Sequence, residues 1–147
     1  MSSLESIPVQ IEGGPDGAYR TDNLKPLLLQ VEQALQDLLD HAEETVIDLT
    51  AMPFSAQDEQ DLRDCLGRGE VTASVDAFGP TLIQETGFPG VWLVDHQDAE
   101  QRRLTLHLEV ARVPGILATP HDDLADSLAA LRRFNLNPSD SPTEDVQ

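Results

Sequence analysis

The chain has 147 residues, and 27 acidic against nine basic side chains give it a formal net charge of −18. Binding to nucleic acids and to anionic membranes depends on Lys and Arg, so this composition excludes both classes of partner. Apolar residues make up 39% of the chain, enough to close one core, and the single cysteine cannot form an internal disulfide.

Composition changes along the chain and predicts one domain with an irregular segment at each end. Residues 1–20 are rich in Ser, Pro and Gly, which predicts an irregular leader. Residues 21–134 predict a single α+β domain, and the polar residues 135–147 predict a disordered acidic tail. We find neither an apolar stretch long enough to span a bilayer nor the pattern of a secretion signal. We therefore expect a cytoplasmic protein.

The first predicted element is an amphipathic helix from Asn23 to near Ala42. Leu and Val recur there at three- and four-residue steps, with Gln, Glu and Asp between them. Residues 45–49 follow as a short apolar run with β-branched side chains. This run predicts an inner strand.

A second helix is predicted after the next loop. Ser55 and Asp58 have the spacing of a capping box, and Gly67 is a natural helix terminator. Cys65 falls on the apolar face of this helix. We expect it to be buried in the core rather than to act as a reactive thiol.

Four further strands are predicted between Gly69 and Leu117. Residues 71–77 alternate apolar and polar side chains, residues 81–85 and 91–96 form shorter extended segments, and residues 104–113 alternate most clearly. Pro120 and the acidic residues after it predict the start of a last helix, which carries an apolar stripe of three leucines. The element order predicts an α+β fold in which three helices pack on a mainly antiparallel sheet of about five strands.

The last two strands define the predicted contact surface. If they pair with Leu93 opposite Leu106, Trp92 lies opposite His107, on the face away from the leucines. That face then carries an aromatic side chain among apolar and polar neighbours, a mixture typical of binding patches. In the alternative, a helix covers this face and Trp92 belongs to the core. We predict that Trp92→Ala weakens capture of the partner and leaves the fold intact.

The histidines do not predict a metal site, and we predict no metal and no cofactor. With this pairing, His96 and His107 lie about four residues out of register. They are then separated by roughly 13 Å, too far to share one ion. His41 ends one predicted helix and His121 begins another.

The carboxylates are the sole basis for an enzyme hypothesis. Glu85 and Glu109 could approach each other across the sheet and act as acid and base. However, such pairs arise readily in so acidic a chain, and the sequence shows neither a nucleophile with a base nor a phosphate-binding loop. We therefore predict that the protein is not an enzyme.

Several short motifs together resemble the hydrogenase expression/formation proteins of the HupH type, over about residues 24–133. The motifs are Val46-Ile47-Asp48-Leu49, Gly69-Glu70-Val71, Ile83-Gln84-Glu85-Thr86, Phe88, Gly90-Val91-Trp92, Glu109-Val110, Val113-Pro114 and Ile116-Leu117. The match is closest to what would be the C-terminal domain of that family. Gly115 departs from the pattern, which often has an acidic residue there.

This resemblance implies a non-catalytic, chaperone-like role in the maturation of an uptake [NiFe] hydrogenase. The implied partner is the iron–sulfur small-subunit precursor or another maturation protein. Larger members resemble two such units in tandem, so a single-unit chain could form a homodimer. The candidate partner-binding residues are Glu85, Phe88, Trp92, Val94, His107 and Glu109. The alternative functions are a generic acidic interaction module unrelated to hydrogenase and a carboxylate-based enzyme.

Overall fold

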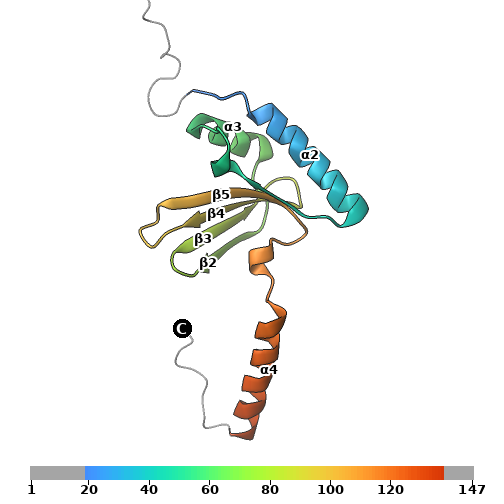
Figure 1. Ribbon diagram of the computed structural model, residues 1–147, viewed down its shortest axis with the longest axis vertical. Helices are drawn as coiled ribbons and strands as arrows, with labels where there is room; N and C mark the ends of the chain where they lie inside the picture. Colours follow the sequence, from blue (N-terminus) through green and yellow to red (C-terminus); the bar gives the residue numbers. More distant parts are fainter. Residues whose placement is uncertain (1–18, 138–147) are drawn as a thin grey trace, which may run out of the picture. The chain divides into compact units, whose positions relative to one another are not determined.

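The computed structural model describes residues 19–137, so the predicted leader and tail lie almost entirely outside the described residues. Within them, three α-helices and five strands follow one another along the chain (Figure 1). Their bounds are α2 Leu24–His41, β1 Thr45–Asp48, α3 Ala56–Leu66, β2 Thr72–Asp76, β3 Pro80–Glu85, β4 Val91–Gln97, β5 Arg103–Val110 and α4 His121–Leu136. The described residues also contain two short 3-10 helices, η1 Leu49–Ala51 and η2 Gly115–Leu117. The predicted α+β class and element order are confirmed.

The chain divides into two compact units, Met1–Pro114 and Gly115–Gln147. The first contains the whole sheet with α2 and α3, and the second contains α4. A single domain over residues 21–134 stays a prediction.

All strand pairs in the sheet are antiparallel, and the strand order is β1-β5-β4-β3-β2. After β1 the chain passes through α3 to the opposite edge and then returns by a meander, so that β5 pairs with β1. Residues 45–49 were expected to form an inner strand, and this expectation is wrong, since β1 is an edge strand. Its β-branched residues reflect one buried face, with Ile47 inward, rather than burial on both faces.

The register of β4 with β5 differs from the predicted one by two residues. Leu93 pairs with Leu108 rather than Leu106, and Val94 pairs with His107. The hairpin contains an irregularity between His96 and Gln97, which sequence alternation does not reveal. Because the shift is even, every side chain stays on its predicted face.

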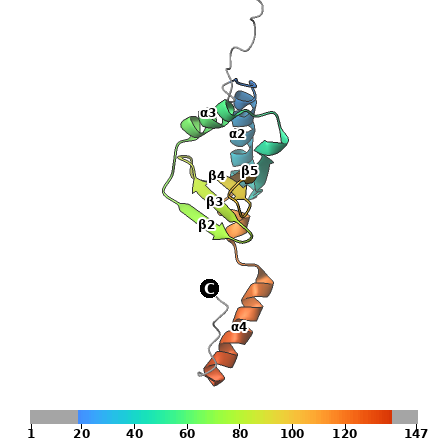
Figure 2. The ribbon, with the colours of Figure 1, turned by 90° about the vertical axis from the view of Figure 1, so that its left-hand side faces the viewer.

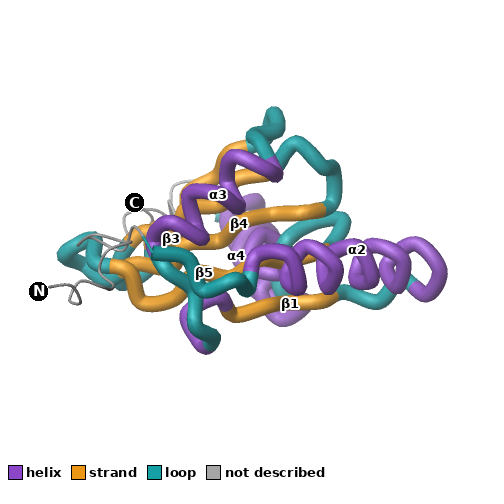
Figure 3. Tube along the Cα trace, turned by 90° about the horizontal axis from the view of Figure 1, so that it is seen from above, coloured by secondary structure: helices purple, strands orange, loops and turns teal. Residues whose placement is uncertain are grey.

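Helices α2 and α3 cover one face of the sheet (Figure 1, Figure 2). Seen from above, α2 runs along the β1 side and α3 lies over the other strands (Figure 3). The core between them contains residues of both helices and of three strands: Leu27, Val31, Ala34, Ile47, Leu62, Leu66, Val91, Leu93, Leu106, Leu108 and Val110. This layer holds the end of α2 against the sheet, where the candidate site lies.

The start of α3 has the predicted capping box. The Ser55 hydroxyl accepts from the Asp58 backbone N–H, and the buried Asp58 carboxylate accepts from the Ser55 N–H and from Thr21. Burial opposes ionisation of Asp58, but these hydrogen bonds outweigh it and lower the pKa of this carboxyl. Cys65 near the end of the helix is exposed, so the expected burial of this residue is wrong. Leu62 and Leu66 fill the inward face instead.

Helix α4 has 16 residues, and none of them is buried. The three leucines of the predicted stripe, Leu124, Leu128 and Leu131, are each half exposed or more. Pro120 occupies the N-cap position and Asp122 and Asp123 lie in the first turn, close to the predicted start.

Candidate partner-binding groove

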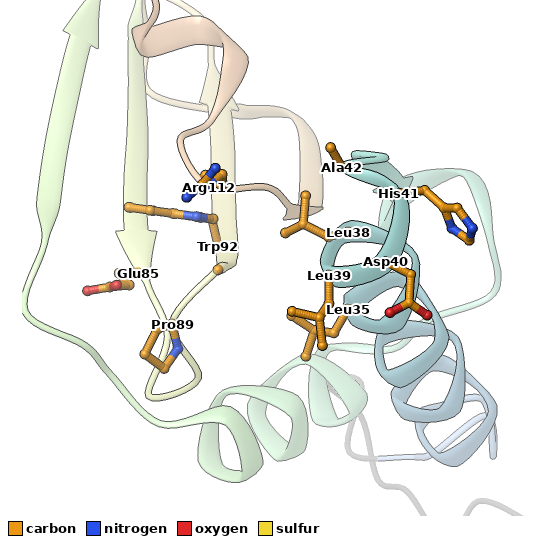
Figure 4. Close-up of a pocket in the computed structure, with 11 residues that line it drawn as sticks. Leu35, Leu38, Leu39, Asp40, His41, Ala42, Glu85, Pro89, Trp92 and Arg112 are labelled. Carbon is orange, nitrogen blue, oxygen red and sulfur yellow. The ribbon is translucent and has the colours of Figure 1, made fainter.

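A hollow of about 840 Å³ lies between the end of α2 and the end of the sheet. Leu35, Leu38 and Leu39 of α2 form one wall. Pro89 and Trp92 belong to the other wall, and the α2 leucines point toward them (Figure 4). This volume lies within the range of ligand and peptide pockets.

A second hollow of about 290 Å³ adjoins the first, since Leu35 lines both. Its lining is almost wholly apolar: Leu28, Val31, Leu35, Leu66, Phe88 and Val91, with Glu32 and Cys65 at the rim. We call the two hollows together the α2 groove. It runs along α2 and is bounded on the sheet side by the turn 86–91.

The turn 86–91 is held in shape by its own hydrogen bonds. The buried Thr86 donates its backbone N–H to the Val91 carbonyl, and its hydroxyl accepts from the Phe88 N–H. Gly90 has φ of +95°, a conformation that side chains disfavour. Phe88 at the tip is 51% exposed, so a rigid turn presents an aromatic ring beside the groove.

Glu85 supports this turn from behind. Its carboxylate accepts from the backbone N–H groups of Glu70 and Val71 at 3.1 and 3.3 Å. The Gly69 N–H in turn donates to the Glu85 carbonyl at 2.8 Å. Glu85 therefore joins the strand ends of β2 and β3, which is a structural task.

Trp92 is 6% exposed, so the expectation of an exposed tryptophan is wrong. Its indole N–H donates to the Ala111 carbonyl at 3.0 Å, which holds the ring against the chain beyond β5. The edge of the ring lines the α2 groove without projecting from it (Figure 4). Because the residue is buried and hydrogen-bonded, Trp92→Ala should damage the fold, contrary to the sequence expectation.

Glu85 and Glu109 do not form an acid–base pair. Both residues pair with Trp92, from β3 and from β5, so the three lie in one row across the sheet. The backbones of Glu85 and Glu109 are two strand spacings apart, roughly 10 Å. The Trp92 side chain lies between their two side chains. The arrangement in the described residues therefore offers no pair of converging carboxylates at this position.

The remaining predicted contacts lie on the same face but are not freely exposed. Val94 is 0% exposed, and His107 and Glu109 are half-buried. Val94 is surrounded because Ile83 and His107 occupy the paired positions on its two neighbouring strands. It cannot touch a partner in this conformation.

The two histidines on this face are much closer than the sequence suggested. The rings of His96 and His107 are 5.0 Å apart between centroids and meet edge to face. The expected separation of roughly 13 Å is therefore wrong, because the true register brings them within two residues of each other. His96 Nδ1 lies 3.2 Å from the Thr81 hydroxyl.

A group of potential metal ligands lies at the end of α2. Ligand atoms of Asp37, His41 and Glu43 lie within 4.8 Å of one another. Ala42 is left-handed and the Glu43 N–H donates to the Asp37 carbonyl, which turns Glu43 back toward the helix. Exposed carboxylates gather often on so acidic a chain, and these three residues do not by themselves identify a metal centre.

The charges around the α2 groove are mainly negative. Asp40, Glu32 and Glu85 line it, and its basic lining residues are Arg112 and His41. An apolar floor with an acidic rim suits a partner segment that combines apolar and basic side chains.

The structure thus brings together three of the six predicted contacts and adds others. Glu85, Phe88 and Trp92 line the α2 groove, whereas Val94, His107 and Glu109 are absent from its lining. Sequence reasoning missed the α2 contribution, above all Leu39, which is 80% exposed. The signal was present, because Leu38 and Leu39 are adjacent and one helix face cannot bury both.

Among residues 19–137, no helix combines the length and the apolar content needed to cross a membrane.

Comparisons with known proteins all identify hydrogenase expression proteins as similar to this chain. The C-terminal conserved region of the HupH hydrogenase expression proteins matches residues 22–135. The hydrogenase expression/formation protein HupQ of Azotobacter chroococcum mcd 1 is 34% identical over 114 residues, which are 76% of this chain and 40% of that protein. The hydrogenase expression/formation protein HoxQ of Azotobacter vinelandii is 31% identical over 122 residues, which are 82% of this chain and 42% of that protein.

A solved structure gives the same result. The hydrogenase expression protein HupH from Thiobacillus denitrificans ATCC 25259 superposes with a TM-score of 0.77 at 37% identity. The match covers 81% of this chain and 99% of that one. By contrast, the chain spans about two fifths of the length of the two curated relatives.

Proposed function

Because the chain belongs to the HupH family of hydrogenase expression proteins, we propose that it is a non-catalytic, chaperone-like accessory protein for an uptake [NiFe] hydrogenase. Its relatives are hydrogenase expression/formation proteins, which supports a role for the chain in hydrogenase maturation. The proposed place of action is the cytoplasm, where a precursor is available before export.

The proposed partner is the precursor of the iron–sulfur small subunit. The observation that carries this proposal is the α2 groove, an apolar channel with Asp40, Glu32 and Glu85 at its rim. An export signal that joins arginines to an apolar segment has the complementary chemistry. The net charge of −18 would speed the encounter with such a segment.

The absence of catalysis is part of the proposal. It is supported by Glu85, whose carboxylate is engaged by two backbone N–H groups, and by the indole between Glu85 and Glu109. A generic acidic interaction module is the alternative function. It predicts binding of basic peptides in general, without preference for a hydrogenase precursor.

A second copy of the chain is also a proposed partner. The chain covers 40% and 42% of the length of the HupQ and HoxQ relatives, so two copies would approach the size of one such protein. Dimerisation would supply a second unit of the kind that the family resemblance implies for larger members.

The groove is tested by replacing exposed aromatic side chains on two different turns. Phe88→Ala removes a ring at the groove, and Phe78→Ala removes the 99% exposed ring of the β2–β3 turn, which lies outside the groove lining. We expect Phe88→Ala to weaken binding of the purified small-subunit precursor about tenfold, equivalent to about 1.4 kcal/mol. Phe78→Ala should leave the affinity within about twofold of the wild type.

The measurement is calorimetry or surface plasmon resonance with the precursor and with the same precursor lacking its export signal. Equal affinity of wild type and Phe88→Ala would remove the groove from the proposal. Equal affinity for the two precursors would show that the export signal is not the segment bound. Comparable binding of an unrelated Arg-rich apolar peptide would favour the generic module.

A further inference from the structure

The α2 side of the groove is one continuous face of a helix, which we call the α2 stripe. Its residues recur at three- and four-residue steps and line the two hollows: Leu28, Val31, Leu35, Leu38 and Leu39. Val31 is buried, whereas Leu39 is 80% exposed, so the stripe borders the core on one side and solvent on the other. This spacing is that of a helix surface that packs against a second helix.

The sheet side of the groove has no strand edge to which an extended segment could add. The strand residues in its lining are Glu85 of β3 and Val91 and Trp92 of β4. Both strands are paired on their two sides, because the edges of the sheet are β1 and β2. Recognition by strand addition needs the free backbone groups of an edge strand, so this mode of binding is not available in the α2 groove.

The turn 86–91 also offers few backbone partners. Among the described residues, N–H groups of this turn already have acceptors at Thr86, Gly87, Phe88 and Val91. Pro89 has no N–H, so at most the N–H of Gly90 is open to a partner. An extended segment in the groove would therefore leave its own N–H and C=O groups unpaired against apolar side chains, which is unfavourable. An α-helix pairs these groups within itself.

We propose that the α2 groove binds the apolar segment of its partner as an α-helix, which lies along α2 between the α2 stripe and the turn 86–91. This inference rests on the proposed function, because it gives the conformation of the segment that the groove is proposed to bind. The length of the stripe supports it. From Leu28 to Leu39 the stripe is roughly 17 Å long, which accommodates about 11 residues of a helix but about five of an extended chain. The apolar segment of an export signal has about 7–15 residues.

The polar residues beside the stripe suit the edge of such a helix. A row of exposed polar side chains with four-residue spacing follows the solvent side of the stripe: Glu32, Gln36 and Asp40. The Gln36 side chain donates to the Asp40 carboxylate at 2.8 Å. A bound helix with its apolar face on the stripe directs the side chains at the edge of that face toward this row. Arginines at that edge would meet carboxylates, so the fitting ligand is an amphipathic helix with a basic edge.

The first test compares three synthetic peptides of the precursor's export signal, with binding to the full chain measured by calorimetry. A proline in the middle of the apolar segment removes a helix hydrogen bond and clashes with the preceding turn, so it should weaken binding about a hundredfold. The matched control has its proline at the first position of the segment, where a helix tolerates it, and should stay within about threefold of the unmodified peptide. Equal affinities of the two proline peptides overturn the proposal.

The second test determines the conformation of the bound peptide. Its Cα chemical shifts on the full chain should move to helical values, and an alanine scan should give losses of affinity at three- and four-residue steps. Strand values of the shifts, or losses at every second residue, overturn this inference and leave the proposed function in place. A peptide that does not bind the wild-type chain at all overturns both.

The third test places the helix on α2 with two leucine variants. Leu39→Ala shortens an exposed side chain of the α2 stripe, and Leu29→Ala is the matched control, because Leu29 is 57% exposed on the same helix and lies outside the groove lining. Leu39→Ala should weaken binding of the unmodified peptide about tenfold. Leu29→Ala should stay within about twofold of the wild type. Equal losses in the two variants contradict a helix that lies on the stripe.

Discussion

At the scale of single residues, the positions that carry the family resemblance mostly shape the backbone. Glu85 binds the backbone N–H groups of residues 70 and 71, Thr86 closes the turn before β4, and Trp92 holds the segment after β5 through Ala111. These contacts explain why such residues occur together without forming a catalytic site. Their hydrogen bonds support the backbone around the α2 groove.

Gly69 gives the sharpest prediction at this scale. A Cβ at this position would lie 2.4 Å from the Thr86 carbonyl oxygen, which is backbone and cannot move aside. We expect Gly69→Ala to lower the free energy of unfolding by about 1–3 kcal/mol, the usual cost of overpacking. Gly115→Ala is the control, because nothing lies within 4 Å of its Cβ. Urea unfolding followed by circular dichroism checks both, and equal stability of the two variants would contradict this account.

The sequence predicted residue faces better than residue exposure. Alternation in β4 and β5 assigned Trp92 and Val94 to the face away from the leucines, which is correct. Burial of that face depends on what neighbouring strands and loops place over it, and alternation contains no such information. Trp92 and Cys65 show the two resulting errors, one residue buried against expectation and the other exposed.

At the scale of elements, Arg103 links α3 to the sheet through ion pairs. Arg103 at the start of β5 binds Glu59 of α3 at 2.7 and 3.1 Å and Asp95 of β4 at 3.1 and 3.0 Å. The two carboxylates hold the pKa of Arg103 above its usual value. Pairs of parallel hydrogen bonds of this kind are stronger and more directional than single ones.

Removing this arginine should loosen α3. Arg103→Ala is expected to lower the free energy of unfolding by about 1–3 kcal/mol, since it leaves the partly buried Asp95 carboxylate without this partner and Glu59 with Arg63 alone. Arg102→Ala is the adjacent control, because the Arg102 side chain is 75% exposed and its ion pairs are local. Thermal unfolding of both variants checks the prediction. A loss as large for Arg102→Ala would assign the effect to net charge instead.

Element existence was predictable from the sequence, whereas strand position and strand register were not. The helix 23–42 and the capping box at Ser55 depend on local spacing, which the sequence contains in full. The edge position of β1 and the shifted pairing of β4 with β5 depend on a crossover and on an irregular hairpin. Both are long-range or turn properties, which no local pattern encodes.

At the scale of the whole molecule, the candidate site is a product of the tertiary fold. The α2 groove draws on residues 28–42, 65–66, 85–92 and Arg112, which are distant in sequence. Of its lining, only Glu85, Phe88 and Trp92 were predicted as contacts from the sequence. The acidic character of the groove was predictable, because acidic residues outnumber basic ones throughout the chain.

The same acidity makes stability dependent on pH. Burial opposes ionisation of Glu59, but hydrogen bonds from Arg103 and Arg63 outweigh it and lower the pKa of this carboxyl; hydrogen bonds likewise lower the pKa of Asp58. Because the folded-state pKa values lie below the unfolded ones, these groups stabilise the fold above about pH 4.3, and this contribution is lost as the pH falls through the folded values. We expect a lower urea midpoint at pH 3.5 than at pH 7. Glu59→Gln should show a smaller drop, and an equal drop would exclude Glu59 as a cause.

The chain contains a single tryptophan, and it is enclosed at the end of the groove with its N–H engaged. Its intrinsic fluorescence therefore comes from one defined site. Emission of the native protein should be blue-shifted relative to the denatured protein, with no label needed. A ligand that enters beside Leu38 and Pro89 would alter the quenching of this same ring, so one optical signal reports both the integrity of the sheet end and the occupancy of the channel next to it.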